Sequence, residues 1–201
     1  MTASEAQPTS RPGGRTARTR AAVRDATNAE LAEHGYAGLT IEAVAARSGV
    51  HKTTLYRRWG GVDGLIADAL ALADEDDWQP PDTGSFDRDL LELTREVLAT
   101  FADPTTAAAP TAFVAAAFQS PSAATALHAF YAERHRRSAV LVDRAVTRGE
   151  VPAGTDAVAV VTAAVAPIYY RVLLAGEPPT DDMAARSARA VAHAARAGTY
   201  A

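Results

Sequence analysis

Apolar residues recur along the chain at the three- and four-residue spacing of amphipathic helices, and no stretch alternates apolar and polar residues as a half-buried strand would. Proline and glycine divide this pattern at intervals that suit helices. The dividing residues are Gly35, Gly49, Gly60-Gly61, Pro80-Pro81, Pro104, Pro121, Pro152 with Gly154, and Gly176 with Pro178-Pro179. We therefore predict an all-α protein of about nine helices, at residues 16–34, 41–48, 52–59, 62–77, 85–102, 105–117, 122–149, 156–175 and 180–197. Pro110 and Pro167 fall inside two of these helices, where proline kinks or breaks a helix.

Residues 39–60 predict two short helices joined by a tight turn, in the sequence LTIEAVAARSGVHKTTLYRRWG. Thr40 stands where a side chain caps the first helix. Ala45 is small enough for a close helix crossing, and Gly49 can adopt the positive φ that a sharp turn after a helix requires. Leu55, six residues later, turns back into the same core. This spacing is typical of a helix-turn-helix motif.

The second of these helices has one apolar face and one polar face. Leu55 and Trp59 lie one turn apart and face the core. In a helix-turn-helix protein the other face enters the DNA major groove, where cationic and hydroxyl side chains contact base edges and phosphates. The residues predicted to contact DNA are Thr40, His51, Lys52, Thr53, Thr54, Tyr56 and Arg57. The alternative is a solvated basic helix that binds nothing, and the turn pattern together with the outward-facing aromatic Tyr56 favours DNA.

The stretch GLTIEAVAARSGVHKTTLYRRWG, with EHGY before it, resembles the DNA-binding head of the tetracycline-repressor-like (TetR) transcriptional regulators. Their pattern is an opening helix that ends near Gly-Tyr or Gly-Phe, a Thr-capped second helix, and a recognition helix of the form G-V-x-x-x-T-L-Y-x-x-F/W. The resemblance covers about residues 20–70, and PIYYRVLLAGEPPTDD nearer the C-terminus looks like the end of one large subgroup. It implies a homodimeric, ligand-responsive regulator that binds double-stranded DNA.

One position departs from this family pattern. Many relatives begin the fourth helix with a lysine, and its side chain and the helix N-terminus hold a DNA phosphate. This chain has Val62 at that position, followed by Asp63. The backbone N–H groups of Gly60 and Gly61 are the candidates to replace the missing anchor.

Charge divides the chain into a basic N-terminal part and an acidic remainder. Residues 1–60 carry nine Arg and Lys against five Asp and Glu, a net +4, whereas residues 61–201 carry eleven against nineteen, a net −8. A basic head on an acidic body predicts a polyanion partner for the head alone. We therefore expect a disordered tail at 1–14, a helix-turn-helix DNA-binding domain at 15–60, and a ligand-binding and dimerisation domain at 61–201.

The basic residues Arg11, Arg15, Arg18 and Arg20 form an arm before the helix-turn-helix. Two interpretations stay open. The arm either follows a DNA minor groove, as homeodomain arms do, or is an unstructured, arginine-rich leader.

Composition excludes several classes of protein. The chain has no cysteine, which excludes disulfide frameworks, zinc–thiolate sites and thiol catalysis, and its 48% hydrophobic content is ample for a core. No apolar run is expected to approach the ~20 residues of a membrane span. The polar N-terminus lacks the apolar core of a signal peptide, so we expect a cytoplasmic protein.

The sequence gives little sign of metal or enzyme chemistry. The five histidines form no HExxH motif, and the acidic run at 74–77 is typical of a solvated helix end, so we expect no metal site and no cofactor. No GxSxG motif or P-loop is present. An all-α enzyme whose basic helix is incidental is the rival class, and we expect no enzyme.

Aromatic residues spread over the central helices predict a core that also lines a small-molecule cavity. Polar residues among them would orient the ligand, and His128 and His135 lie seven residues apart on one helix face. The candidate ligand contacts are Phe118, Gln119, His128, Tyr131, His135 and Tyr169.

The last two predicted helices carry stripes of small and branched apolar residues, which permit close helix approach. Two such stripes repeated by a two-fold axis would form a four-helix interface, unless both pack on the chain's own core. The residues predicted at the homodimer interface are Val158, Val161, Val165, Ile168, Val172, Met183, Ser187, Ala190, Val191 and Ala194.

The function expected from these features is a homodimeric repressor, released from a palindromic operator by a small-molecule effector. An activator or a ligand-independent regulator is equally compatible with the head. The effector and the operator sequence are not encoded in any motif of the chain.

Overall fold

The computed structural model describes residues 13–74 and 77–201, and within these ranges the chain forms nine α-helices, one π-helical segment and no strand. The elements are α1 (Gly13–Gly38), α2 (Ile41–Ser48), α3 (Lys52–Trp59), α4 (Val62–Asp74), α5 (Phe86–Thr100), α6 (Pro104–Ala117), α7 (Pro121–Thr147), α8 (Ala157–Tyr169), the π-helix η1 (Tyr170–Leu174) and α9 (Asp181–Arg196). The predicted all-α fold is confirmed.

Most helix ends lie within two residues of the prediction, and those of α2 and α3 coincide with it. Helix α8 ends at Tyr169, six residues before its predicted end, and the π-helix η1 continues it to Leu174. Helix α1 differs at both ends. It begins at Gly13 and continues to Gly38 across a break at Gly35, which has a φ of 66°. Of the tail expected at 1–14, residues 1–12 lie outside the described residues, and Gly13 and Gly14 belong to α1. Pro110 and Pro167 split neither helix, because α6 and α8 continue through them.

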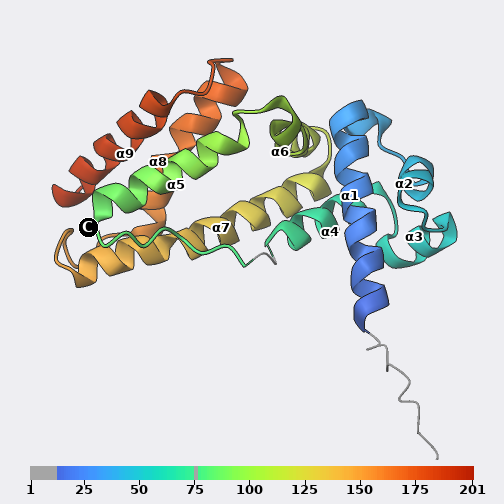
Figure 1. Ribbon diagram of the computed structural model, residues 1–201, viewed down its shortest axis with the longest axis horizontal. Helices are drawn as coiled ribbons and strands as arrows, with labels where there is room; N and C mark the ends of the chain where they lie inside the picture. The colour runs from blue at the N-terminus through green and yellow to red at the C-terminus, as the bar shows by residue number, and fades with distance from the viewer. Residues whose placement is uncertain (1–12, 75–76) are drawn as a thin grey trace, which may run out of the picture.

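The molecule is elongated, with α1, α2 and α3 at one end and α5, α8 and α9 at the other (Figure 1). The long helix α7 connects the two ends. It packs against α4 and α6 on the side of the head, and against α5 and α8 on the far side. Helix α1 packs against both α4 and α6, so the head contacts the body through more than its covalent link.

The buried side chains form two main cores. The first joins the head to α4, α6 and the start of α7, and it contains Val23, Leu31, Val44, Leu55, Leu65, Ile66, Phe113 and Leu127. The second joins α5, the end of α7, α8 and α9, and it contains Phe86, Leu90, Leu141, Val160, Val161 and Val191. Helix α4 therefore packs into the core of the head, although it follows the recognition helix in the chain.

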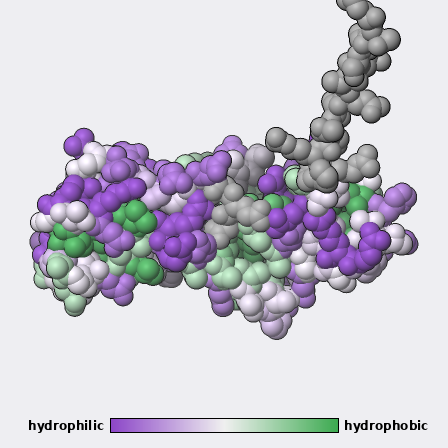
Figure 2. Space-filling model, turned by 90° about the horizontal axis from the view of Figure 1, so that it is seen from below, coloured by the Kyte–Doolittle hydropathy of each residue, from purple (hydrophilic) through white to green (hydrophobic). Residues whose placement is uncertain are grey.

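One described segment, Ala157–Leu174, is long and apolar enough by length and composition to cross a membrane, contrary to the expectation from sequence. It consists of α8 and η1, which pack against α5, α7 and α9 as part of the helical bundle. Only 28% of its residues are buried, so α8 presents an apolar outer face. Hydrophobic patches among hydrophilic residues are also visible on the face seen from below (Figure 2).

Candidate DNA-binding surface and ligand cavities

The turn between α2 and α3 has the geometry predicted for a helix-turn-helix. The Oγ1 of Thr40 accepts a hydrogen bond from the Ala43 N–H at 3.1 Å and so caps α2. Gly49 adopts a φ of 70°, in the left-handed region that favours glycine, and its N–H donates to the Ala45 carbonyl oxygen at 3.0 Å. Leu55 then returns to the core, where it is completely buried. These contacts fix the orientation of α3 relative to α2.

The polar face of α3 lies at the surface. His51, Lys52, Thr53 and Arg57 are exposed, and half of the Tyr56 side chain is accessible. Two other predicted DNA contacts are less free, since Thr54 is half-buried and the Thr40 hydroxyl already caps α2. The surface that is available to DNA therefore consists of His51, Lys52, Thr53, Tyr56 and Arg57.

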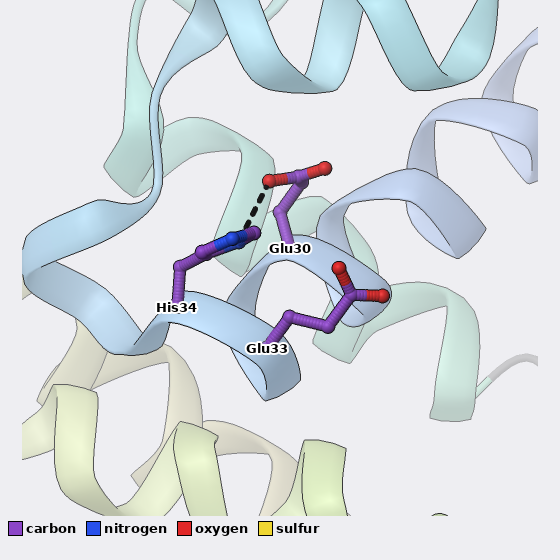
Figure 3. A group of neighbouring side chains, drawn as sticks. All are labelled: Glu30, Glu33 and His34. Carbon is purple, nitrogen blue, oxygen red and sulfur yellow. Dashed lines mark ion pairs between the residues drawn. The ribbon is translucent and has the colours of Figure 1, made fainter.

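A cluster of charged residues holds α2 against α1. Glu30, Glu33 and His34 lie close enough together for metal binding, and they are drawn in Figure 3. The carboxylates are already paired: Arg47 of α2 donates to Glu30 and to Glu33, at 2.6 Å each, and His34 lies 3.1 Å from Glu30. A metal ion would have to displace this guanidinium, so we interpret the cluster as an ion-pair clamp within the head.

A second clamp joins the recognition helix to two other helices. The indole N–H of Trp59 donates to one carboxylate oxygen of Asp68 at 2.9 Å, and Arg20 donates to the other at 2.8 Å. Asp68 of α4 therefore holds the end of α3 and α1 together. Of the predicted basic arm, Arg20 belongs to this clamp, Arg18 is exposed, and Arg11 lies outside the described residues.

The junction between α3 and α4 is tight. The N–H of Gly60 donates to the Tyr56 carbonyl oxygen at 2.9 Å, so it closes α3 and is not free to replace the missing lysine anchor. A Cβ added to Gly64 would lie 1.8 Å from the carbonyl oxygen of Trp59. Only glycine allows the first turn of α4 to approach the end of α3 so closely.

Asp63, next to Val62, connects the head to the body. Its Oδ1 accepts hydrogen bonds from the Tyr36 hydroxyl of α1 and from the Ser120 hydroxyl before α7, both at 3.0 Å. Hydrogen bonds from Ser122, Ser120 and Tyr36, that from Ser122 foremost, hold the pKa of the Asp63 carboxyl below its usual value. Ser120 also caps α7 through the Ala123 N–H. This set of four residues, Tyr36, Asp63, Ser120 and Ser122, is called the Asp63 node below.

The first cavity of the body, cavity 1, has a volume of about 410 Å³. It lies between the end of α6, α7, α8 and η1. Five of the six predicted ligand contacts line it, namely Phe118, His128, Tyr131, His135 and Tyr169, together with apolar residues such as Val114, Leu127 and Leu173. Gln119 is not among its lining residues, because its side chain donates to the Ala115 carbonyl oxygen at 3.3 Å. Phe118 lies at the surface, with 82% of it exposed.

A second cavity, cavity 2, has a volume of about 460 Å³ and lies between α5, α7 and α8. Tyr131, His135, Val165 and Tyr169 line both cavities and so form a shared wall. Beyond the wall, cavity 2 is bordered by Trp78, Glu96, Thr100, Phe101, Arg134 and Ser138, among others. Trp78 is held in place by Glu96, which accepts from its indole N–H at 2.9 Å, and by Arg134, which stacks 4.4 Å from its ring centroid.

The predicted dimer stripe is partly wrong. Five of its members are buried inside the chain's own core: Val161, Val165, Ile168, Met183 and Val191. They face inward because α8 and α9 pack against α5 and α7 as well as against each other. The rest are exposed, as Val158 and Ala190 are, or half-buried, as Val172, Ser187 and Ala194 are. A shallow groove of about 280 Å³ between the two helices, lined in part by Ala163, Pro167 and Ala190, marks the outer face.

Sequence reasoning missed the residues whose partners lie far along the chain. Asp68 binds partners 9 and 48 residues away, and Asp63 binds partners 27 and 57 residues away. The departure from the family pattern at Val62-Asp63 pointed to Asp63, whereas nothing in the local sequence indicated the role of Asp68. Trp78, Glu96 and Arg134 of cavity 2 were also missed.

Comparisons with known proteins agree with this architecture. Residues 23–69 match the family described as "Bacterial regulatory proteins, tetR family", and residues 80–191 match "Tetracyclin repressor-like, C-terminal domain". The HTH-type transcriptional regulator AqdR of Rhodococcus erythropolis is 35% identical over 142 residues, which are 71% of this chain and 68% of that relative. An uncharacterized HTH-type transcriptional regulator of Mycobacterium tuberculosis is 29% identical over 153 residues, 76% of this chain and 75% of that one.

Solved structures give the same result. The TetR family transcription regulator SCO0332 superposes with a TM-score of 0.69 at 30% identity, over 88% of this chain and 97% of that one. A TetR regulator of Agrobacterium tumefaciens, with a TM-score of 0.70 over 92% and 98% of the two chains, is 20% identical and shares the fold. The two family matches together cover the helix-turn-helix head and most of the all-α body, which makes this chain a helix-turn-helix transcriptional regulator. The chain belongs to the TetR family, and the relatives that it resembles are transcriptional regulators.

Proposed function

We propose that this protein is a homodimeric transcriptional repressor of the cytoplasm, which leaves a palindromic operator when a small molecule binds in its body. The observation that carries the proposal is the exposed basic face of α3. Leu55 anchors that face in the core, and the Trp59–Asp68 hydrogen bond holds the end of the helix. A rigid helix with cationic side chains on its outer face is the form in which helix-turn-helix proteins read the major groove.

DNA readout by α3 is tested with a duplex selected from a random-sequence pool. Arg57→Ala should weaken binding by about 1–3 kcal/mol if the side chain makes a bidentate base contact. Lys52→Ala should reduce the slope of log affinity against log salt by about one unit if the ammonium contacts a phosphate. Arg88→Ala removes an exposed arginine of α5 and is the matched control, for which no change is expected. Unchanged binding by the Lys52→Ala/Tyr56→Ala double variant would remove α3 from the interface.

The homodimer is assigned to the outer face of α8 and α9. Support comes from the apolar character of α8, from its low burial, and from the small residues Ala163 and Ala190 beside the groove. A two-fold axis through this face would present the heads to successive major grooves, about 34–36 Å apart. Ala190→Arg, at an exposed position, should give folded monomers in native mass spectrometry, whereas Ala129→Arg on α7 should leave the dimer intact. A dimeric Ala190→Arg variant would place the interface elsewhere.

Release by a ligand is supported by the position of cavity 1 and the Asp63 node. Phe118, which lines the cavity, lies two residues before Ser120, whose hydroxyl donates to Asp63 at the start of α4. A ligand that moves this segment would move α4, and with it the head, because α4 belongs to the core of the head. A hundredfold loss of operator affinity needs ~2.7 kcal/mol of coupling, and operator DNA must then weaken ligand binding by the same factor. A ligand of the body that binds equally tightly with and without operator would refute this role.

A further inference from the structure

Cavities 1 and 2 are separated by a pair of tyrosines. The rings of Tyr131 and Tyr169 meet edge to face, with centroids 5.4 Å apart. Phe101 packs against the other side of Tyr169, with centroids 5.6 Å apart. The shared wall therefore contains these two aromatic side chains, which rearrange more easily than a helix backbone, together with His135 and Val165.

Cavity 1 is an uncharged space. No Asp, Glu, Lys or Arg is among the residues that line it, and its polar atoms belong to histidine rings and tyrosine hydroxyls. The Nδ1 of His135 lies 3.2 Å from the Thr162 hydroxyl. Burial lowers the pKa of His135, so its ring is neutral at pH 7. A charged group placed against this lining would find no counter-ion among its residues.

Cavity 2 presents polar groups of both signs. Arg134 and Glu96 both line it, together with the hydroxyl residues Thr100 and Ser138. An anionic ligand group would meet the Glu96 carboxylate, and a cationic one would meet the Arg134 guanidinium. A neutral group that both donates and accepts hydrogen bonds meets neither penalty. It can accept from Arg134 and donate to Glu96 or to the hydroxyl oxygens of Thr100 and Ser138, whose own hydrogens are donated to backbone carbonyl groups.

We propose that the two cavities are the two halves of one site for an uncharged amphipathic molecule. Its apolar part fills cavity 1, its neutral hydrogen-bonding head lies in cavity 2, and it crosses the wall by parting the Tyr131–Tyr169 pair. This inference rests on the proposed effector function and adds the chemical class of the ligand. Each cavity is within the size range of small-molecule sites.

Three probes test the charge and the shape of the ligand by calorimetry on the full chain. 4-Hexylphenol has a neutral head and an apolar tail, 4-hexylbenzoate has the same tail with an anionic head, and phenol has the head alone. 4-Hexylphenol should bind at least tenfold more tightly than either of the others. Binding of 4-hexylbenzoate as tight as that of 4-hexylphenol, or no detectable binding of 4-hexylphenol, would overturn the proposal.

Two exposed alanines allow each half to be filled separately. Ala166 lines cavity 1 and Ala99 lines cavity 2, so a phenylalanine at either position occupies one half without entering the core. Both Ala166→Phe and Ala99→Phe should weaken 4-hexylphenol binding at least tenfold, whereas only Ala99→Phe should weaken phenol. Ala129→Phe, at an exposed position of α7 outside both cavities, is the control. If Ala99→Phe leaves 4-hexylphenol binding unchanged, the ligand occupies cavity 1 alone and the two-part site is refuted.

Glu96→Gln tests why a neutral head is preferred. The amide oxygen can still accept from the Trp78 indole N–H, but the negative charge is gone. The preference for 4-hexylphenol over 4-hexylbenzoate should fall several-fold, and an unchanged ratio would show that Glu96 does not face the head. Duplex binding is measured in parallel. Probe binding without any effect on DNA would refute the effector role alone, and DNA binding without probe binding would refute the ligand class alone.

Discussion

The contacts that support the recognition helix and the walls of the body's cavities use their polar side chains in different ways. In the head, Arg47 neutralises Glu30 and Glu33, and Asp68 joins Trp59 to Arg20, so the exposed face of α3 rests on closed sets of ion pairs. In the body, tyrosine and histidine side chains border two cavities that the helices leave unfilled. A DNA reader needs a fixed geometry, whereas a sensor needs room for a ligand.

The largest effect is expected on the free energy of unfolding when a leucine is replaced by alanine, and the loss should differ between the packed core of the head and the edge of a cavity in the body. Leu55 is completely buried in the head and lines none of the three cavities described above, so Leu55→Ala should destabilise the protein by about 2–5 kcal/mol. Leu127 borders cavity 1, so its side chain has fewer packing contacts on that side. The destabilisation caused by Leu127→Ala should therefore lie at the lower end of that range, at about 2 kcal/mol. Urea unfolding measures both. Equal losses would contradict the difference in packing.

The junction of α3 and α4 should be nearly as sensitive. Gly64→Ala forces a Cβ against the Trp59 carbonyl oxygen, which should cost about 1–3 kcal/mol and displace the recognition helix. Gly61→Ala is the matched control three residues away, since a Cβ there meets no atom within 4 Å. Thermal unfolding and duplex binding should both change for Gly64→Ala only. A Gly64→Ala variant with normal DNA binding would show that the junction tolerates movement.

The same contrast explains which parts of the structure could be predicted from the sequence. The ends of α2 and α3 were predictable because Thr40, Gly49 and Gly60 act on their own neighbours, through caps and turns that leave local signatures. The aromatic residues of cavity 1 were found because they recur along α7 and α8. The buried face of α8 was assigned to an interface because periodicity gives a stripe but not the neighbour that covers it, and Val161 and Val165 proved to face the body's core.

The clamps were beyond prediction for a related reason. Asp68 could be recognised as a partner of Arg20 only once α1 and α4 were known to be adjacent, and the two residues are 48 positions apart. Propensity and spacing describe single helices, whereas an ion pair between helices depends on their packing.

An intermediate effect is expected where the two regions meet. Ser120→Ala removes the cap of α7 and one hydrogen bond of the Asp63 node, and Thr180→Ala removes a comparable cap from α9, far from the head. Each should lower stability by about 1 kcal/mol. Only Ser120→Ala should also reduce the factor by which a ligand of the body weakens duplex binding. An equal reduction by Thr180→Ala would mean that the coupling follows overall stability and not the Asp63 node.

The smallest expected effect is a difference between the two regions in how their contribution to stability depends on pH. Burial lowers the pKa of His135 in the folded body, so as the pH falls through the unfolded value of about 6.5 the unfolded chain binds more protons and stability is lost. The neighbouring Tyr131 and Tyr169 have raised pKa values and stay neutral in this range. In the head, the lowered pKa of Asp63 affects stability only below its usual value of 3.8, outside the same pH window.

Urea unfolding should therefore show less stability at pH 5.5 than at pH 7.5. His135→Asn should remove part of that loss and His193→Asn, at an exposed position of α9, should not. A His135→Asn variant that keeps the whole loss would assign it to other groups and remove the pH contrast between head and body.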